Sequence, residues 1–187
     1  MSRLIYPRLA TSFIALLFLM LVGLLFLISL DLIGLAFRKL GFSPIYSVLL
    51  LFMSLIGSYI NIPVREIASR EPLISGYLFT KVDLGDLLLA VIVMTVFIHM
   101  LARPVLGLGI AVPALLPPIA AALLAFIISP GQAPIIAYIS GTLGSLVGAD
   151  LLNLDKIPDL RTPVASIGGA GTFDGIFLTG IISVLIA

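Results

Sequence analysis

The chain has 187 residues, of which 61% are hydrophobic and 10% charged, with a formal net charge of +1 and a mean hydropathy of +1.30. This composition excludes an ordinary soluble domain, and apolar runs without strand-like alternation predict helices instead of a membrane barrel. The scattered basic residues offer no nucleic-acid surface, and the absence of cysteine removes thiolate metal sites. We therefore expect membrane lipids as partners, and no nucleic acid, cofactor or metal.

An all-α polytopic bundle of about six membrane spans is predicted, in a single integral membrane domain over residues 1–187. About 20 apolar residues are needed to cross a bilayer as a helix. The first uncharged run, from Leu9 to Leu30, has 22 residues and is expected to remain as an anchor, because it exceeds the core of a signal peptide. The predicted spans are residues 9–30, 45–60, 87–102, 114–129, 134–151 and 172–187, with a polar loop at 64–86.

Three segments between these spans carry their own signals. Asp31–Leu40 mixes charged and apolar residues and is expected to lie at the membrane interface as an amphipathic piece. Ile74–Val82 is rich in residues that favour strands and predicts a small hairpin. Val105–Pro118 is uncharged but contains two glycines and three prolines. It therefore predicts a broken or re-entrant element packed inside the protein, because each proline removes a helical hydrogen bond.

His99 is the one histidine of the chain and lies in the third predicted span. It precedes Arg103 by one helical turn, and this spacing favours an interfacial pair over a metal ligand. With a single histidine and no cysteine, a zinc site has almost no ligands available.

Two aspartates are the best functional lead, because each lies at the inner end of a strongly apolar segment. Asp150 ends the fifth predicted span and Asp174 begins the sixth. Small residues recur at every fourth position of the fifth span, which lets a neighbouring backbone approach closely. The two rows are Gly141, Ser145 and Ala149, and Ser140, Gly144 and Gly148. The short connection predicts that these two spans are antiparallel neighbours, with both carboxyl groups on one side of the membrane.

Two carboxyl groups that meet in a low-dielectric setting share a proton, so that one acts as base and the other as acid. The helix dipoles favour the carboxylate form of Asp174, at a helix start, and the protonated form of Asp150, at a helix end. We therefore expect Asp174 to be the base and Asp150 the acid. The alternative is structural: Asp174 caps the sixth span and Asp150 faces water. Gly168–Thr172 resembles a phosphate-binding loop only weakly, since Asp174 would repel the anion.

Four motifs together resemble an uncharacterised prokaryotic membrane family, the domain of unknown function 1614. They are Gly148-Ala-Asp-Leu-Leu-Asn-Leu154, Ala165-Ser-Ile-Gly-Gly-Ala-Gly-Thr-Phe-Asp-Gly-Ile-Phe177, Tyr59-Ile-Asn-Ile-Pro63 and the segment from Pro113 to Pro118. The resemblance implies a multi-pass protein in the cell membrane of a bacterium or archaeon, and it carries no activity. The supporting residues of the candidate site are taken as Gly169, Gly171, Thr172, Gly175, Asn153, Asn61 and His99.

The general plan is also similar to that of the presenilin and signal-peptide-peptidase group, intramembrane aspartyl proteases with one aspartate in each of two consecutive helices. Their second aspartate lies in a Gly-x-Gly-Asp motif, whereas here Asp174 follows Gly169-Ala-Gly171 two residues late. Ala149 stands where a tyrosine usually precedes the first aspartate. Pro113-Ala-Leu115 lies before both aspartates, where the group has this motif after them.

Three functions follow from these patterns. The first is an aspartyl intramembrane protease-like hydrolase that uses Asp150 and Asp174 on a transmembrane peptide. The second is a small proton- or ion-coupled transporter or channel component with the same aspartates as the ion site, lined by the broken Pro/Gly-rich element. The third is a non-catalytic membrane scaffold, whose small-residue helix faces pack against a partner or form an oligomer.

Overall fold

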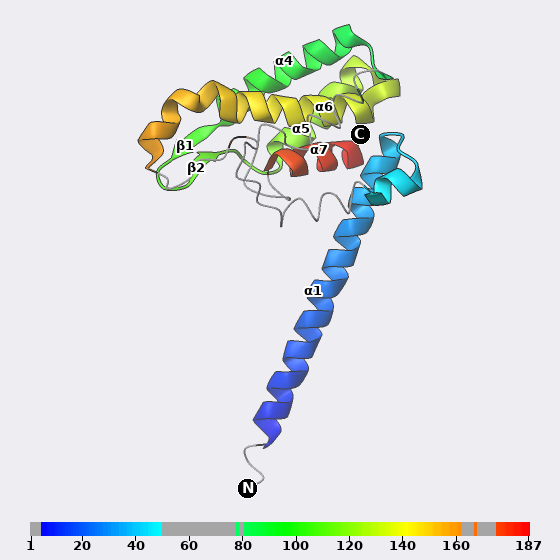
Figure 1. Ribbon diagram of the computed structural model, residues 1–187, viewed down its shortest axis with the longest axis vertical. Coiled ribbons are helices and arrows are strands. Elements are labelled where there is room, and N and C mark those ends of the chain that lie inside the picture. The colour runs from blue at the N-terminus through cyan, green and yellow to red at the C-terminus, as the bar shows by residue number, and fades with distance from the viewer. Residues whose placement is uncertain (1–4, 50–77, 79–80, 162–166, 168–174) are drawn as a thin grey trace.

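The computed structural model describes residues 5–49, 78, 81–161, 167 and 175–187. It confirms the predicted all-helical class, apart from one small hairpin (Figure 1). The α-helices are α1 (Ile5–Lys39), α4 (Leu84–Leu101), α5 (Leu116–Ile128), α6 (Ala133–Ser145) and α7 (Gly175–Ile186). The hairpin strands are β1 (Arg103–Val105) and β2 (Gly109–Ala111). Residues 44–49 are also helical, while the rest of the second predicted span lies outside the described residues.

The helix starts follow local sequence chemistry. Asp83 caps α4, because its carboxylate accepts hydrogen bonds from the backbone N–H groups of Gly85 at 2.9 Å and Asp86 at 3.2 Å. Pro117 and Pro118 stand in the first turn of α5, where a missing N–H costs nothing. A short 3₁₀ turn, η4 (Pro130–Gln132), then leads into α6. Helix α4, which corresponds to the third predicted span, therefore begins directly after its cap at Asp83, three residues earlier than expected.

Helix α6 forms the centre of a bundle with α4, α5 and α7 around it. Ten of its residues are buried, including the whole stretch from Ile136 to Thr142. Its backbone changes pitch at Leu146, where a π-helical turn, η5 (Leu146–Asp150), begins. A 3₁₀ segment, η6 (Leu151–Leu160), follows and contains Pro158. The fifth predicted span thus extends beyond Asp150 in a different helical form.

Glycines allow α6 and its extension η5 to approach two neighbouring helices closely. A Cβ atom on Gly148 would lie 2.5 Å from the carbonyl oxygen of Thr95 in α4, and one on Gly144 would lie 2.7 Å from the Cβ of Met94. On α7, a Cβ on Gly180 would lie 2.5 Å from the Cγ2 of Thr142. The small residues predicted to let backbones approach therefore do so inside this chain.

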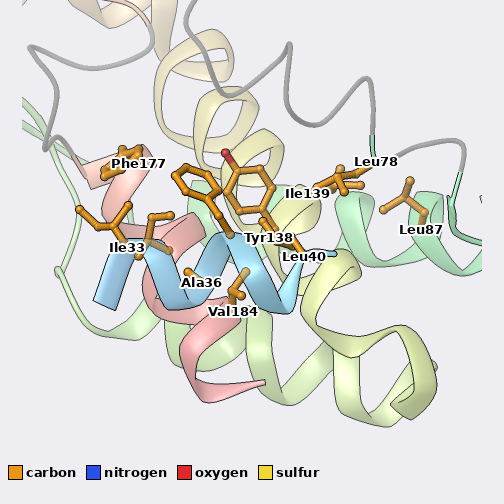
Figure 2. Packing of buried hydrophobic residues seen from close by; sticks show 11 residues of the cluster. Ile33, Ala36, Leu40, Leu78, Leu87, Tyr138, Ile139, Phe177 and Val184 are labelled. Atoms are coloured by element: carbon orange, nitrogen blue, oxygen red, sulfur yellow. The ribbon is translucent and has the colours of Figure 1, made fainter. Parts of the chain in front are cut away.

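Figure 1 shows α1 as a long rod that extends away from the bundle and reaches it at one end only. Residues 14–29 are exposed throughout, whereas Ile33, Ala36 and Phe37 are buried. These side chains form a core cluster with residues of α6 and α7, including Tyr138 and Val184 (Figure 2). The segment Asp31–Leu40, expected to lie at the interface as an amphipathic piece, thus continues α1 and buries its apolar side against the bundle.

The same end of α1 is joined to α7 by a polar contact. The Lys39 ammonium donates hydrogen bonds to the backbone carbonyls of Val184, at 3.3 Å, and Leu185, at 3.1 Å. The last carbonyls of a helix have no partner within it, and the dipole favours a cation there. Lys39 therefore supplies α7 with a cap from the other end of the sequence.

The Pro/Gly-rich segment breaks the helical backbone, as predicted. The strands β1 and β2 pair antiparallel with Val105 opposite Gly109, and Gly107 and Gly109 adopt positive φ angles of 77° and 115°. The expectation that this element packs inside the protein is not met at its tip, which is exposed. Of the hairpin predicted at Ile74–Val82, the structure describes Leu78, Lys81 and Val82, and none of them is in a strand.

Three helical stretches of the described residues are long and apolar enough to cross a membrane: Ile14–Lys39, Leu84–Leu101 and Pro130–Leu160. Helices α5 and α7 have 13 and 12 residues. At 1.5 Å per residue they reach about 20 Å and 18 Å. They are therefore shorter than the roughly 30 Å hydrocarbon core of a bilayer.

Candidate functional site

Asp150, the first predicted catalytic residue, is the last residue of η5 and is half-buried. It lies at the end of the bundle that also carries β1, β2 and η6, here called the hairpin end (Figure 1). Asp174 lies outside the described residues, so the meeting of the two carboxyl groups stays a prediction. Gly175, which follows Asp174 in the sequence, is the first residue of α7.

A buried asparagine in η6 follows the π-helical turn, three residues after Asp150. Asn153 is fully buried, and its φ and ψ of −120° and 17° are not helical. Its side-chain amide nitrogen donates hydrogen bonds to the backbone carbonyls of Gly148 at 3.1 Å and Ala149 at 2.9 Å. These carbonyls belong to the turn whose normal ladder is interrupted, so Asn153 supplies the donors that the break removes.

Two further polar side chains complete a cluster around Asn153. The Lys156 ammonium donates to the Asn153 side-chain oxygen at 2.6 Å. His99 Nδ1 lies 3.3 Å from the carbonyl oxygen of Gly148 and 3.3 Å from the Asn153 amide nitrogen. Both amide hydrogens of Asn153 are directed to carbonyls, so the consistent tautomer has His99 Nδ1–H donating to Gly148. The cluster of His99, Asn153 and Lys156 therefore ties α4 to both η5 and η6.

The contact from His99 depends on a glycine at position 148. A Cβ atom there would lie 3.1 Å from the backbone nitrogen of His99 and 3.2 Å from the Cβ of Ile98. Any larger residue would push α4 away and move the imidazole from the Gly148 carbonyl. Helical spacing predicts a pair of His99 with Arg103. In the described part of the chain, His99 instead contacts the Gly148 carbonyl, which lies far away in the sequence.

Buried hydroxyl groups line the inside of the bundle. Thr142, Thr179 and Ser183 donate to carbonyls of their own helices at 2.6–3.2 Å. Ser140 and Ser145 are also buried, and their hydroxyls have no hydrogen-bond partner in the described part of the chain. Buried polar groups of this kind are costly, since an unsatisfied group loses about 1–3 kcal/mol. They are the polar features of α6 that packing alone does not explain.

The structure thus brings together three of the predicted site residues: Asp150, Asn153 and His99 lie at the hairpin end. In the described part of the chain, no atom lies within 4 Å of a Cβ placed on Gly175, so no close backbone approach there explains the glycine. The predicted residues Asn61, Gly169, Gly171 and Thr172 lie outside the described residues. Within the described ranges, no group of three or more His, Cys, Asp or Glu side chains is placed to hold a metal ion.

Sequence reasoning missed Lys156. A signal was present, because Lys156 lies three residues after Asn153 in a short helical segment and side chains at this spacing meet on one face. Recognising the contact also required the 3₁₀ geometry of η6, which the hydrophobic pattern does not specify.

Comparison with known families gives one match, to a family described as a protein of unknown function (DUF1614), over residues 71–186. That range covers more than half of the chain. The chain belongs to the DUF1614 family. No curated protein and no solved structure matches it. The resemblance to presenilins and signal peptide peptidases is not shown by these comparisons and stays a prediction.

The DUF1614 match contains the whole hairpin end, with β1, β2, η5 and η6, and the helices α4–α7 that carry it. Helix α1 lies before the matched range. The family region therefore corresponds to the bundle and its polar cluster, and α1 is joined to it mainly through the last turns near Phe37 and Lys39.

Proposed function

We propose that this DUF1614 protein is a membrane-embedded aspartyl hydrolase that cleaves transmembrane peptides with Asp150 and Asp174. The observation that supports the proposal most is the packing of α7 along α6, in the opposite direction (Figure 1). Gly180 of α7 contacts Thr142, and Gly141 of α6 lies beside Thr179. Asp150 is the last residue of η5, and Asp174 precedes the start of α7 in the sequence by one residue, so this direction favours a shared end.

The chemistry of the proposal needs one protonated and one ionised carboxyl group. Asp174 takes a proton from a water molecule, and the water oxygen attacks the carbonyl carbon of the peptide bond. Asp150 donates its proton to the carbonyl oxygen, which gives a neutral tetrahedral intermediate. Collapse of this intermediate breaks the C–N bond: Asp174 gives its proton to the leaving amine, and Asp150 takes a proton from a hydroxyl of the intermediate, which restores both carboxyl groups.

The polar cluster has a supporting role in this proposal. Asn153 and His99 bind the carbonyl groups of Gly148 and Ala149, the two residues before Asp150. A catalytic carboxyl group must be held within a few tenths of an ångström to be effective. The cluster thus fixes the backbone that carries Asp150 at a point where the regular helix has ended.

The test is proteolysis in liposomes by the purified full-length protein. The probes are synthetic transmembrane peptides with an apolar core of about 20 residues and varied flanking residues, and the products are identified by mass spectrometry. Asp150→Asn and Asp174→Asn are each expected to lower cleavage more than 100-fold. Asp155→Asn is the matched control, because Asp155 is an exposed aspartate of η6 and should leave cleavage unchanged. Absence of cleavage by the unaltered protein, or cleavage that survives both active-site substitutions, would refute the proposal.

A second candidate is a proton-coupled transporter, favoured by a different observation. The extension of α6 is interrupted within an apolar segment, and Ser140 and Ser145 carry buried hydroxyls without described partners. Interrupted helices and buried polar groups mark ion pathways in secondary transporters. In this case Asp150→Asn would abolish acidification of dye-loaded liposomes under a pH gradient, while no peptide would be cleaved.

The scaffold alternative would need the small-residue faces to be available to a partner. Gly144 and Gly148 contact α4, and Gly141 contacts Thr179 and Ala121. These contacts within the chain occupy the rows of α6, so the scaffold alternative gains no support from them. An oligomer through other helix faces stays a prediction.

A further inference from the structure

The exposed leucines of the hairpin end are the apolar feature that neither helix packing nor the proposed chemistry uses. Leu106 and Leu108, at the tip between β1 and β2, are 74% and 83% exposed. Exposed leucines also occur along η6, at Leu151, Leu152 and Leu154. Together the hairpin Arg103–Ala111 and η6 are called the hairpin platform.

The hairpin platform is one fixed unit. The backbone N–H of Gly107, at the tip, donates to the carbonyl of Leu160, at the end of η6, at 2.9 Å. The tip turn is closed by the N–H of Leu108, which donates to Val105 at 3.1 Å. The N–H groups of the exposed tip at Gly107 and Leu108 therefore have partners, as backbone in contact with a lipid phase requires.

Exposed apolar side chains also occur in the elements on either side of the hairpin in the sequence. Met100, in the last turn of α4, is 79% exposed, and Leu115, before α5, is 63% exposed. Helix α4 is one of the stretches long and apolar enough to cross a membrane. The tip leucines thus follow, in the sequence, a helix whose length and composition suit a membrane.

The charges of the platform identify the kind of lipid surface. Its exposed ionisable side chains are Asp155 and Asp159 on η6, with Arg103 and Arg161 at the ends of its two segments. With the half-buried Lys156 of η6, the platform has two acidic and three basic groups, far from the cluster of four to eight basic residues that attracts an anionic membrane. Apolar side chains among mixed charges suit the headgroup boundary of a zwitterionic bilayer.

We propose that the hairpin platform lies in the interface of the bilayer, with Leu106 and Leu108 inserted below the phosphate level and the charges of η6 in the headgroup layer. The insertion uses the hydrophobic effect, so it does not depend on salt or on anionic lipid. This placement defines one membrane boundary at the hairpin end and puts the cluster of His99, Asn153 and Lys156 close beneath it. It holds whether or not the protein is a hydrolase.

The absence of cysteine in the sequence makes a direct depth measurement simple. Single variants Leu106→Cys, Leu108→Cys and Asp159→Cys of the full-length protein are labelled with a nitroxide in phosphatidylcholine vesicles. Collision rates with oxygen, which concentrates in lipid, and with a water-soluble nickel chelate then give the depth of each label. We expect the labels at 106 and 108 to collide more often with oxygen than with the nickel chelate, as labels about 5–10 Å below the phosphates would. The label at 159 should collide more often with the nickel chelate than with oxygen.

Two results would overturn the proposal. If labels at 106 and 108 meet the nickel chelate as readily as the label at 159, the tip is in water. If they are shielded from both reagents, protein covers the tip, and spin–spin broadening that disappears on dilution with unlabelled chain identifies that protein as a second copy. Supporting results must also persist in 0.5 M salt and on addition of anionic lipid, because the proposed insertion is not electrostatic. Catalytic activity enters none of these measurements.

Discussion

At the scale of single residues, Asn153 is a buried polar side chain with partners on both its nitrogen and its oxygen. Its side chain forms hydrogen bonds with two backbone carbonyls and with the Lys156 ammonium, while being fully buried. A buried amide with every group satisfied stabilises one backbone arrangement, since any other leaves polar atoms without partners. Asn153 is therefore expected to stabilise the π-helical turn before it.

Replacing Asn153 with alanine is expected to lower the free energy of unfolding by about 2 kcal/mol, because it leaves two carbonyls and an ammonium without their partner. The measurement is loss of helical circular dichroism on titration with SDS in mixed micelles. Asp155→Ala, on the exposed side of the same segment, is the control and should change stability by less than about 0.5 kcal/mol. Equal stability of the two variants would show that the cluster does not hold η5.

Gly148 gives a second prediction at this scale. Gly148→Ala places a methyl group 2.5 Å from the position of the Thr95 carbonyl oxygen, so α4 must move. Such overpacking costs about 1–3 kcal/mol. Gly23→Ala is the matched control, because Gly23 lies in α1 with nothing within 4 Å of its Cβ position. The same SDS titration should separate the two, and a harmless Gly148→Ala would argue against the close α4–α6 contact.

Single residues also show what the sequence could and could not predict. The row of small residues in α6 predicted close helix packing, because that effect needs only the absence of side chains. The partner of His99 could not be predicted, since Arg103 is its neighbour by spacing while Gly148 becomes its neighbour through tertiary packing. The dyad of Asp150 and Asp174 stays a prediction.

At the scale of elements, the sequence predicted where α4, α5 and α6 begin to within three residues. It did not predict the π-helical form of η5 or the 3₁₀ form of η6. Proline in the first turn located α5 and α6 within two residues. The start of α4 was placed at Leu87, because Asp86 was assigned to the polar loop, whereas the cap at Asp83 sets the start at Leu84. Glycine and proline between Arg103 and Pro118 predicted a break, but pairing into strands depends on the turn at Gly107.

The contact between α1 and α7 carries the prediction at this scale. Lys39→Met removes the cation that binds the carbonyls of Val184 and Leu185, and the last turn of α7 should fray. Hydrogen exchange of the amides at the end of α7 is expected to speed up several-fold. A loss of about 0.3–1 kcal/mol is typical for a cation at a helix end. Arg38→Met is the control, an exposed basic residue of the same turn, and should leave this exchange unchanged.

At the scale of the whole molecule, the chain divides into a bundle and a rod. Residues 14–29 of α1 are exposed on every side, so they contribute little to the packing of the bundle. Residues from Ile33 to Leu40, in contrast, belong to the core cluster with α6 and α7. The uniform apolar surface of the rod is what a membrane anchor requires. Composition alone was enough to predict an apolar helix of this kind.

Deletion of residues 1–28 is therefore expected to leave the unfolding midpoint of the bundle nearly unchanged in detergent. Deletion of residues 1–40 removes the buried side chains of Ile33, Phe37 and Leu40, and should destabilise it by several kcal/mol, since each large buried apolar residue contributes about 2–5 kcal/mol. Differential scanning fluorimetry of both variants checks the difference. Identical midpoints would show that the end of α1 does not belong to the core.

The hydrogen bond from Lys39 to Val184 joins residues that are 145 positions apart. The core cluster beside it likewise combines Phe37 with Phe177 and Val184. A growing chain cannot form this cluster before α7 has been synthesised, so the apolar side of α1 near Phe37 stays uncovered while α4, α5 and α6 are being made. The last contacts of α1 with the bundle are therefore made late, after the preceding helices have been synthesised.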